Sequence, residues 1–212
     1  STKMYSACIT IDDTTKLSLD RIGFKGEVFI VTNEVNQVEK SQSKFLKPDF
    51  DVLLIGRIYF KQKGQDEAIQ FLEDYSETLN TKLKVVIAGS GVDEEKLMRI
   101  LDNKDLINEY TFLGFCEDVT SLYERARIIL MASKFEGVPL VLLEGMTSCK
   151  PILARDIEEF RGFLPSENRM HFIKDDHSKL QALLELNGYQ EYLKFNYKKS
   201  NELNLYEKTL GR

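Results

Sequence analysis

The sequence predicts an α/β fold, a Rossmann-like, doubly wound parallel sheet with helices on both faces. Short apolar segments rich in Val, Ile and Leu recur along the chain without polar alternation, as strands buried on both faces of a sheet require. Segments with helical patterning separate these strands at a regular pace, which is typical of βαβ units.

The alternation is regular from residue 48 to residue 187, and we take this range as the α/β domain. The expected strands are residues 52–55, 83–88, 110–113, 128–132, 151–154 and 170–173. The expected helices are residues 66–79, 94–101, 119–126, 139–148, 157–163 and 178–186.

The two ends of the chain have a different pattern. Residues 7–11 and 28–31 are expected to be strands and residues 14–22 a helix, whereas the polar residues 32–47 predict a linker. Near the other end, aromatic side chains at near-helical spacing predict a long helix over 190–210. The chain therefore divides into an N-terminal segment with a linker (1–47), the α/β domain (48–187) and a C-terminal helix (188–212).

Composition and charge argue against several classes of function. The net charge is −5, from 29 basic and 34 acidic residues, which disfavours a nucleic-acid partner. The three cysteines have no metal-like spacing and indicate a reducing, cytoplasmic setting. The only histidines, His171 and His177, lie six residues apart, so a histidine-built metal site is not expected. No apolar run approaches the roughly 20 residues that span a bilayer.

Glycines, cations and carboxylates follow the predicted strands. Ligands of doubly wound sheets bind at the carboxyl ends of the strands, so we expect these residues to meet at one edge. They are Gly56-Arg57, Lys63-Gly64, Gly89-Ser90-Gly91, Gly114-Phe115 and the segment 133–137. This convergence is harder to explain by structure alone than any single motif is.

Arg57 and Lys63 are candidates for binding a diphosphate. A guanidinium group matches the geometry of phosphate oxygens, and a lysine adds a point charge. Loop cations taken alone are usually solvated surface groups. The neighbouring glycines at the end of a strand favour the phosphate role here.

Gly89-Ser90-Gly91 has two interpretations, a truncated dinucleotide fingerprint or a tight turn between strand and helix. The third glycine of the fingerprint is absent, and no clear acidic ribose anchor follows about 20 residues later. We therefore favour the turn and disfavour a hydride-transferring enzyme.

Glu136 and Glu144 bracket the sequence Gly-Val-Pro-Leu-Val-Leu-Leu. Gly137 and Pro139 argue against one continuous helix, so we expect Glu136 on a loop, Pro139 at the first position of a helix, and Glu144 inside that helix. Free N–H groups at a helix start bind anions, and flanking carboxylates accept hydrogen bonds from hydroxyls. The arrangement suits a ligand with phosphate and sugar; acid–base catalysis and solvated surface charges are the alternatives.

Together these residues resemble the donor-binding half of GT-B glycosyltransferases, in the large retaining group 1 family (glycosyltransferase family 4-like) that has an E-x7-E motif. The resemblance covers roughly residues 50–165, and its five features occur in the family's order. They are Gly56-Arg57 with Lys63-Gly64, the strand 85–88 with Gly89-Ser90-Gly91, the segment 112–119, the segment 133–144 and Lys150-Pro151-Ile152. Gly145 and Ser148-Cys149 depart from the family's usual residues, at a helix and a turn.

The resemblance implies a role for each site residue. Arg57 and Lys63 would bind the donor diphosphate, Glu136 would face the donor sugar and Glu144 would bind the ribose. The backbone of Gly137 and the following residues would present amides, and Gly114-Phe115 would frame the base. The donor-binding residues would be Gly56, Arg57, Lys63, Gly89, Gly114, Phe115, Glu136, Gly137, Val138, Pro139, Leu140, Val141 and Glu144, with Arg57, Lys63 and Glu136 catalytic.

The implied function is transfer of a hexosyl group from a nucleotide sugar, most simply a UDP-sugar, to an acceptor hydroxyl in glycan synthesis. No metal or other cofactor is implied, since this class neutralises the diphosphate with cations and helix ends. GT-B enzymes have two domains. Residues 1–47 resemble the end of the first domain and the linker, so the acceptor domain would be a missing partner. The full enzyme would be cytoplasmic or peripheral at the inner face of a membrane. A nucleotide-sugar-binding module without turnover and a GT-B sugar-nucleotide epimerase are the alternatives.

Overall fold

The computed structural model describes residues 7–10, 27–30, 48–137, 139–148 and 150–186. The chain divides into two compact units, residues 1–37 and 38–212. In the first unit, β1 (Ala7–Thr10) and β2 (Glu27–Ile30) pair in parallel, which confirms the two strands expected there. The expected helix 14–22, the linker 32–47 and the helix 190–210 lie outside the described residues.

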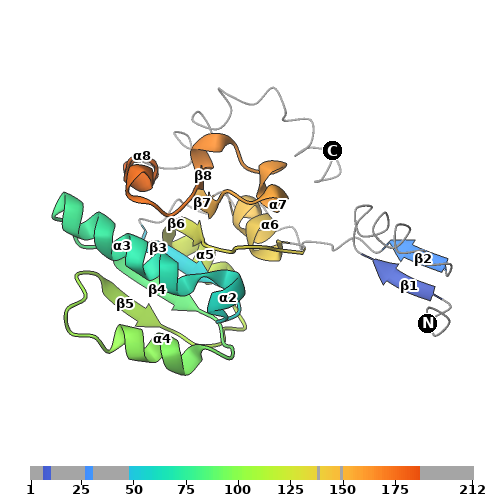
Figure 1. The fold of residues 1–212 in the computed structure, drawn as a ribbon, viewed down its shortest axis with the longest axis horizontal. Coiled ribbons are helices and arrows are strands. Elements are labelled where there is room, and N and C mark those ends of the chain that lie inside the picture. Colours follow the sequence, from blue (N-terminus) through green and yellow to red (C-terminus); the bar gives the residue numbers. More distant parts are fainter. Residues whose placement is uncertain (1–6, 11–26, 31–47, 138, 149, 187–212) are drawn as a thin grey trace. The chain divides into compact units, whose positions relative to one another are not determined.

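The second unit contains a six-stranded, fully parallel sheet, as predicted. Its spatial order is β5-β4-β3-β6-β7-β8 (Figure 1). The chain therefore winds outward from β3 to β5, then crosses back to β6 on the other side of β3. This reversal is a topological switch point, where doubly wound sheets bind ligands. The strands are β3 (Phe50–Ile55), β4 (Lys84–Ala88), β5 (Glu109–Phe112), β6 (Ala126–Met131), β7 (Ile152–Arg155) and β8 (Arg169–Met170).

Helices cover both faces of this sheet (Figure 1). Successive strand residues point to opposite faces, so Leu54 and Leu53 of β3 belong to different core clusters. Helices α3 (Gln65–Leu79), α4 (Glu94–Leu101) and α8 (His177–Leu184) pack on the Leu54 face. Helices α5 (Thr120–Arg125), α6 (Leu140–Thr147) and α7 (Glu158–Arg161) pack on the Leu53 face. The described part also has two 3₁₀ helices, η1 (Ser166–Asn168) and η2 (Lys174–Asp176).

The structure departs from the expected elements at one strand, one helix and one residue. Of the strand expected over 170–173, only Met170 lies in a strand, β8. Helix α2 (Phe60–Lys63) was not expected, because four residues are too few for a helical pattern; it ends at Gly64 in the left-handed conformation, φ +62°. Pro139 was expected at the first helical position and this is wrong. Helix α6 begins at Leu140, and Pro139, with ψ +72°, is the capping residue whose carbonyl accepts a hydrogen bond from Leu143 N–H at 3.1 Å.

The loops after β3 and β4 pack backbone against backbone. Gly89 has φ +136°, and a Cβ at this position would lie 1.9 Å from the carbonyl oxygen of Gly56. A Cβ at Gly91 would lie 2.2 Å from the carbonyl oxygen of Ile58. These glycines are thus required by a tight turn and a close approach, the interpretation that the sequence favoured.

His177 is buried, with 7% of its surface exposed, and lies among aromatic rings. Its ring centroid is 5.1 Å from that of Phe71 and 5.5 Å from that of Tyr75. Neither ring nitrogen has a hydrogen-bond partner among the described residues. Burial therefore lowers the pKa of His177, because the charged imidazolium loses its hydration.

Gly89→Ala should destabilise the domain by about 2–4 kcal/mol, because a methyl group would overlap the Gly56 carbonyl at a strained φ. The measurement is urea unfolding. Gly162→Ala is the control, since no atom lies within 4 Å of a Cβ there and φ is −76°; it should be neutral or slightly stabilising. Equal effects of the two changes would contradict the packing described.

The free energy of unfolding should fall as the pH falls below about 6.5, the ordinary histidine pKa. The folded-state pKa of His177 is lowered, so the unfolded chain binds more protons in the window between the two pKa values. One such group contributes a slope of at most about 1.4 kcal/mol per pH unit. Urea unfolding at pH 8, 7 and 6 measures it.

His177→Phe should flatten this pH dependence. His171→Gln, a change at an exposed histidine, should keep the wild-type dependence. A wild-type slope in His177→Phe would show that another group causes it.

Candidate functional site

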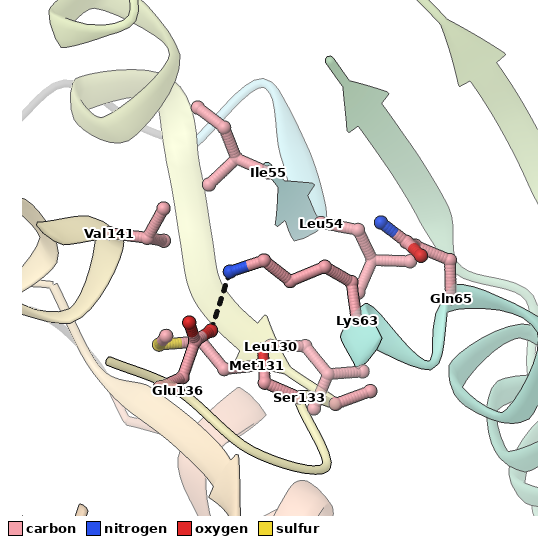
Figure 2. A pocket seen from close by; sticks show the side chains of 10 residues that line it. Leu54, Ile55, Lys63, Gln65, Leu130, Met131, Ser133, Glu136 and Val141 are labelled. Atoms are coloured by element: carbon pink, nitrogen blue, oxygen red, sulfur yellow. Dashed lines mark hydrogen bonds and ion pairs between the residues drawn. The ribbon is translucent and has the colours of Figure 1, made fainter. Parts of the chain in front are cut away.

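A hollow lies at the carboxyl ends of β3 and β6, where the sheet reverses its winding (Figure 2). This is the edge at which the sequence predicted a ligand site. Residues of β3, α2, α3, β6, the following loop and α6 line it: Leu54, Ile55, Lys63, Gln65, Leu130, Met131, Ala132, Ser133, Glu136 and Val141.

Lys63 and Glu136 form an ion pair in this hollow. The Lys63 Nζ lies 2.5 Å from Glu136 Oε1 (Figure 2), and the two side chains are 19% and 5% exposed. A Cβ at Gly64 would lie 2.6 Å from the carbonyl oxygen of Ala132, so the backbone that carries Lys63 packs directly on the end of β6. Removal of one charge would leave the other largely buried and unpaired, which is costly.

Several bonds hold the loop that carries Glu136. The N–H of Lys134 donates to the carbonyl of Gln62 at 2.7 Å, and the N–H of Glu136 donates to Glu159 Oε1 at 3.3 Å. The ammonium of Lys134 lies 2.6 Å from Glu67 on α3, which also pairs with Arg155. Partial burial raises the pKa of Glu67, but these two cations outweigh it and hold the pKa below its usual range. The loop is therefore fixed from α2, α3 and α7.

Glu144 lies in the second turn of α6 and is half-buried. Its Oε2 accepts a hydrogen bond from the hydroxyl of Tyr123 at 2.8 Å. Burial and the nearby charge of Glu144 raise the pKa of Tyr123, so the phenol remains a donor at neutral pH. Glu144 is three residues after Val141, which lines the hollow, and residues three apart share a helix face.

Arg57 follows β3 and is exposed. Its neighbours are fixed, because Gly56 N–H donates to the carbonyl of Ala88 at 3.0 Å and Ile58 N–H donates to that of Ser90 at 2.9 Å. Among the described residues, the Arg57 guanidinium has no hydrogen-bond or ion-pair partner. It is therefore a cation held on a fixed backbone and open to a ligand.

The other predicted residues are placed as follows. Gly89 N–H donates to the carbonyl of Gly114 at 2.7 Å, so the loops after β3, β4 and β5 form one continuous backbone rim. Phe115 beyond it is 73% exposed, and Leu140 is 44% exposed. Gly137 is exposed, and Val138 lies outside the described residues. The structure thus brings Lys63, Glu136 and Val141 into one hollow, with Gly56, Gly89 and Gly114 joined in the rim.

Three residues of this region were not predicted, namely Gln65, Tyr123 and Glu159, whereas Ser133 belongs to the predicted segment 133–137. The position of Gln65 directly after Lys63-Gly64 was the signal that the sequence offered for it. Tyr123 and Glu159 reach the site only through tertiary packing. Within the described residues, no cluster of three or more His, Cys, Asp or Glu side chains is arranged to hold a metal ion. In the same part of the chain, no helix has the length and apolar character needed to cross a membrane.

Comparisons with known proteins identify the family and the fold. Residues 35–198 match the family described as glycosyl transferases group 1. The chain is 25% identical over 164 residues to an alpha-monoglucosyldiacylglycerol synthase of Acholeplasma laidlawii, covering 76% of this chain and 41% of that protein. It is 34% identical over 95 residues to an alpha-1,4-N-acetyl-D-galactosaminyltransferase of Campylobacter jejuni, covering 45% of this chain and 26% of that protein.

Solved structures show the same fold. A mutant of S. aureus TarM, solved with fondaparinux, alpha-GlcNAc-glycerol and UDP, superposes with a TM-score of 0.74 at 20% identity, covering 99% of this chain and 43% of that one. Anabaena HepE, solved with UDP and glucose, gives a TM-score of 0.68 at 15% identity, covering 92% and 58%. The chain thus spans about two fifths of the first relatives that it matches. From the family match and the parallel sheet together, the chain belongs to the group 1 glycosyltransferases and has the Rossmann-like fold of a GT-B domain.

Proposed function

We propose that this chain is the donor-binding part of a retaining, metal-independent glycosyltransferase. The enzyme would move a hexosyl group from a UDP-sugar to an acceptor hydroxyl in glycan or polysaccharide synthesis. The observation that carries the proposal is the Lys63–Glu136 pair at the switch point of the sheet. It combines a cation for a leaving diphosphate with a carboxylate for sugar hydroxyls in one hollow.

The proposed roles follow from charge and position. Arg57 and Lys63 neutralise the diphosphate, so that charge developing on the leaving group is stabilised without a metal ion. Glu136 faces the donor sugar and Glu144 accepts hydrogen bonds from the ribose. UDP is the proposed nucleotide because two neighbours of the same fold were solved with it. Acceptor binding and the second wall of the cleft belong to a further domain.

In the ligand-free protein, the Lys63 ammonium is already paired with the Glu136 carboxylate. A diphosphate must therefore share or displace this carboxylate when it reaches Lys63. The released Glu136 is then free to accept hydrogen bonds from the sugar. Binding of the diphosphate and binding of the sugar are coupled through one ion pair in this scheme.

Glu136→Gln should therefore tighten UDP binding, roughly threefold to tenfold, because it removes a competing internal anion beside Lys63. Isothermal titration calorimetry with UDP measures this. Glu77→Gln removes an equal charge from the exposed end of α3 and should leave the affinity unchanged. Weaker UDP binding by Glu136→Gln would show that the pair does not compete with the diphosphate.

Arg57→Ala and Glu144→Gln should separate the two parts of the nucleotide site. Arg57→Ala should weaken UDP binding about tenfold and leave uridine binding unchanged, because a guanidinium–phosphate contact is lost. Glu144→Gln should weaken UDP and uridine by the same factor, because both carry the ribose. Calorimetry with both ligands, with and without EDTA, measures these effects.

Arg99→Ala, at an exposed arginine of α4, is the control and should bind both ligands like wild type. EDTA should change none of the affinities. Unchanged UDP affinity in both Arg57→Ala and Glu144→Gln would remove the site assignment, and an EDTA-dependent affinity would remove metal independence.

A nucleotide-sugar-binding module without turnover is the second candidate. Incubation with a UDP-sugar and an alcohol acceptor separates the two candidates. UDP binding without release of UDP from the sugar would favour the module, whereas sugar transfer would establish the enzyme.

A further inference from the structure

Gln65 is a buried polar residue directly beside the proposed cations. It is the first residue of α3, follows Lys63-Gly64 and is 5% exposed. Its Nε2 donates to the carbonyl oxygen of Arg57 at 2.7 Å. It also lines the hollow, on the other side of Lys63 from Glu136 in the view of Figure 2.

The hydrogen bond of Gln65 joins the Arg57 backbone directly to the start of α3. The Arg57 segment is fixed to the loop after β4, through Gly56 and Ile58. The same loop supplies Asp93, whose Oδ2 accepts a hydrogen bond from Phe60 N–H at 2.9 Å. Among the described residues, the Gln65 bond is the tie from the Arg57 backbone to the start of α3.

This tie sets one cation relative to the other. Lys63 is fixed by Gly64, which ends α2, begins α3 and packs on Ala132. The Arg57 segment is held by the loop after β4, which also binds Phe60 at the start of α2. A diphosphate needs both charges at a defined spacing, and Gln65 spans the gap between the two backbones that carry them.

The glutamine also carries a cost in stability at this place. Its Oε1 is buried and has no hydrogen-bond partner among the described residues. A buried acceptor without a partner costs free energy. A methionine has nearly the same shape and carries no amide oxygen to leave unpaired, but it would give up the hydrogen bond to the Arg57 carbonyl.

We propose that Gln65 is a positioning residue of the diphosphate site, which holds the Arg57 backbone at the spacing from Lys63 that a diphosphate requires. The proposal rests on the proposed function. Gln65 acts through Arg57 and does not itself touch the ligand, because its free oxygen is closed off from solvent.

A double-mutant cycle on the full chain tests this role. Gln65→Met should weaken UDP binding about fivefold to tenfold in the wild-type protein. In the Arg57→Ala background the same change should cost less than about twofold, because the group that Gln65 positions is gone. Calorimetry with UDP measures all four proteins, and urea unfolding shows that each is folded.

Asn168 offers a matched control. It is fully buried, its Nδ2 donates to the carbonyl of Ile152 at 2.7 Å, and its Oδ1 also has no partner among the described residues. Ile152 is the first residue of β7, so it lies at the amino ends of the parallel strands, whereas the site lies at their carboxyl ends. Asn168→Leu therefore removes the same kind of bond and should leave UDP affinity unchanged.

Amide hydrogen exchange of the ligand-free protein gives a readout that does not depend on UDP. Residues 56–60 should exchange faster in Gln65→Met and at the wild-type rate in Asn168→Leu. If Gln65→Met exchanges faster at residues 56–60 but the wild-type protein does not bind UDP, the hydrogen bond between Gln65 and Arg57 is supported and the proposed function is wrong. Unchanged exchange at 56–60, unchanged UDP affinity, or an equal loss of affinity in both backgrounds would overturn the positioning role.

Discussion

The ion pair between Lys63 and Glu136 links the two halves of the sheet, which are wound in opposite directions from β3. Lys63 belongs to the part that runs from β3 outward, and Glu136 follows β6, after the chain has crossed back. The sheet places β3 and β6 side by side, but their loops extend beyond the last ladder hydrogen bonds. A largely buried pair of charges holds these loops together, because neither charge is tolerated there alone.

Backbone packing gives this pair a rigid base. Gly64 lies against Ala132, and Gly89 lies against Gly56, at distances that a side chain would not allow. The loops after β3, β4 and β6 are therefore packed together, and the charged side chains of this region differ in freedom. Lys63 and Glu136 are already paired, whereas Arg57 has no partner among the described residues. Among the described residues of this region, Arg57 is thus a cation without a partner, whereas a ligand that binds Lys63 must displace the Glu136 carboxylate.

Much of the fold could be predicted from the sequence, because buried parallel strands are continuous apolar runs and their helices are amphipathic. The expected helix 94–101 coincides with α4, and each expected strand of the domain overlaps an observed one. Helix α2 could not be predicted, since a single turn ended by Gly64 has no periodicity to detect. Position at the carboxyl edge could also be predicted for Lys63 and Glu136, but not their direct contact, which depends on the conformation of two loops 73 residues apart.

The partners of the polar side chains were beyond sequence reasoning for a related reason. Glu144, in its apolar stretch, needs a partner, and that partner is Tyr123, which α5 brings to the same face of the sheet as α6. Likewise Glu67 of α3 forms ion pairs with Lys134, in the loop after β6, and with Arg155 of β7. Glu67, Glu136 and Glu144 are thus each matched to a donor in the ligand-free protein. An anionic ligand with hydroxyls suits such a site, because its phosphates take over the cations while its hydroxyls satisfy the carboxylates that they displace.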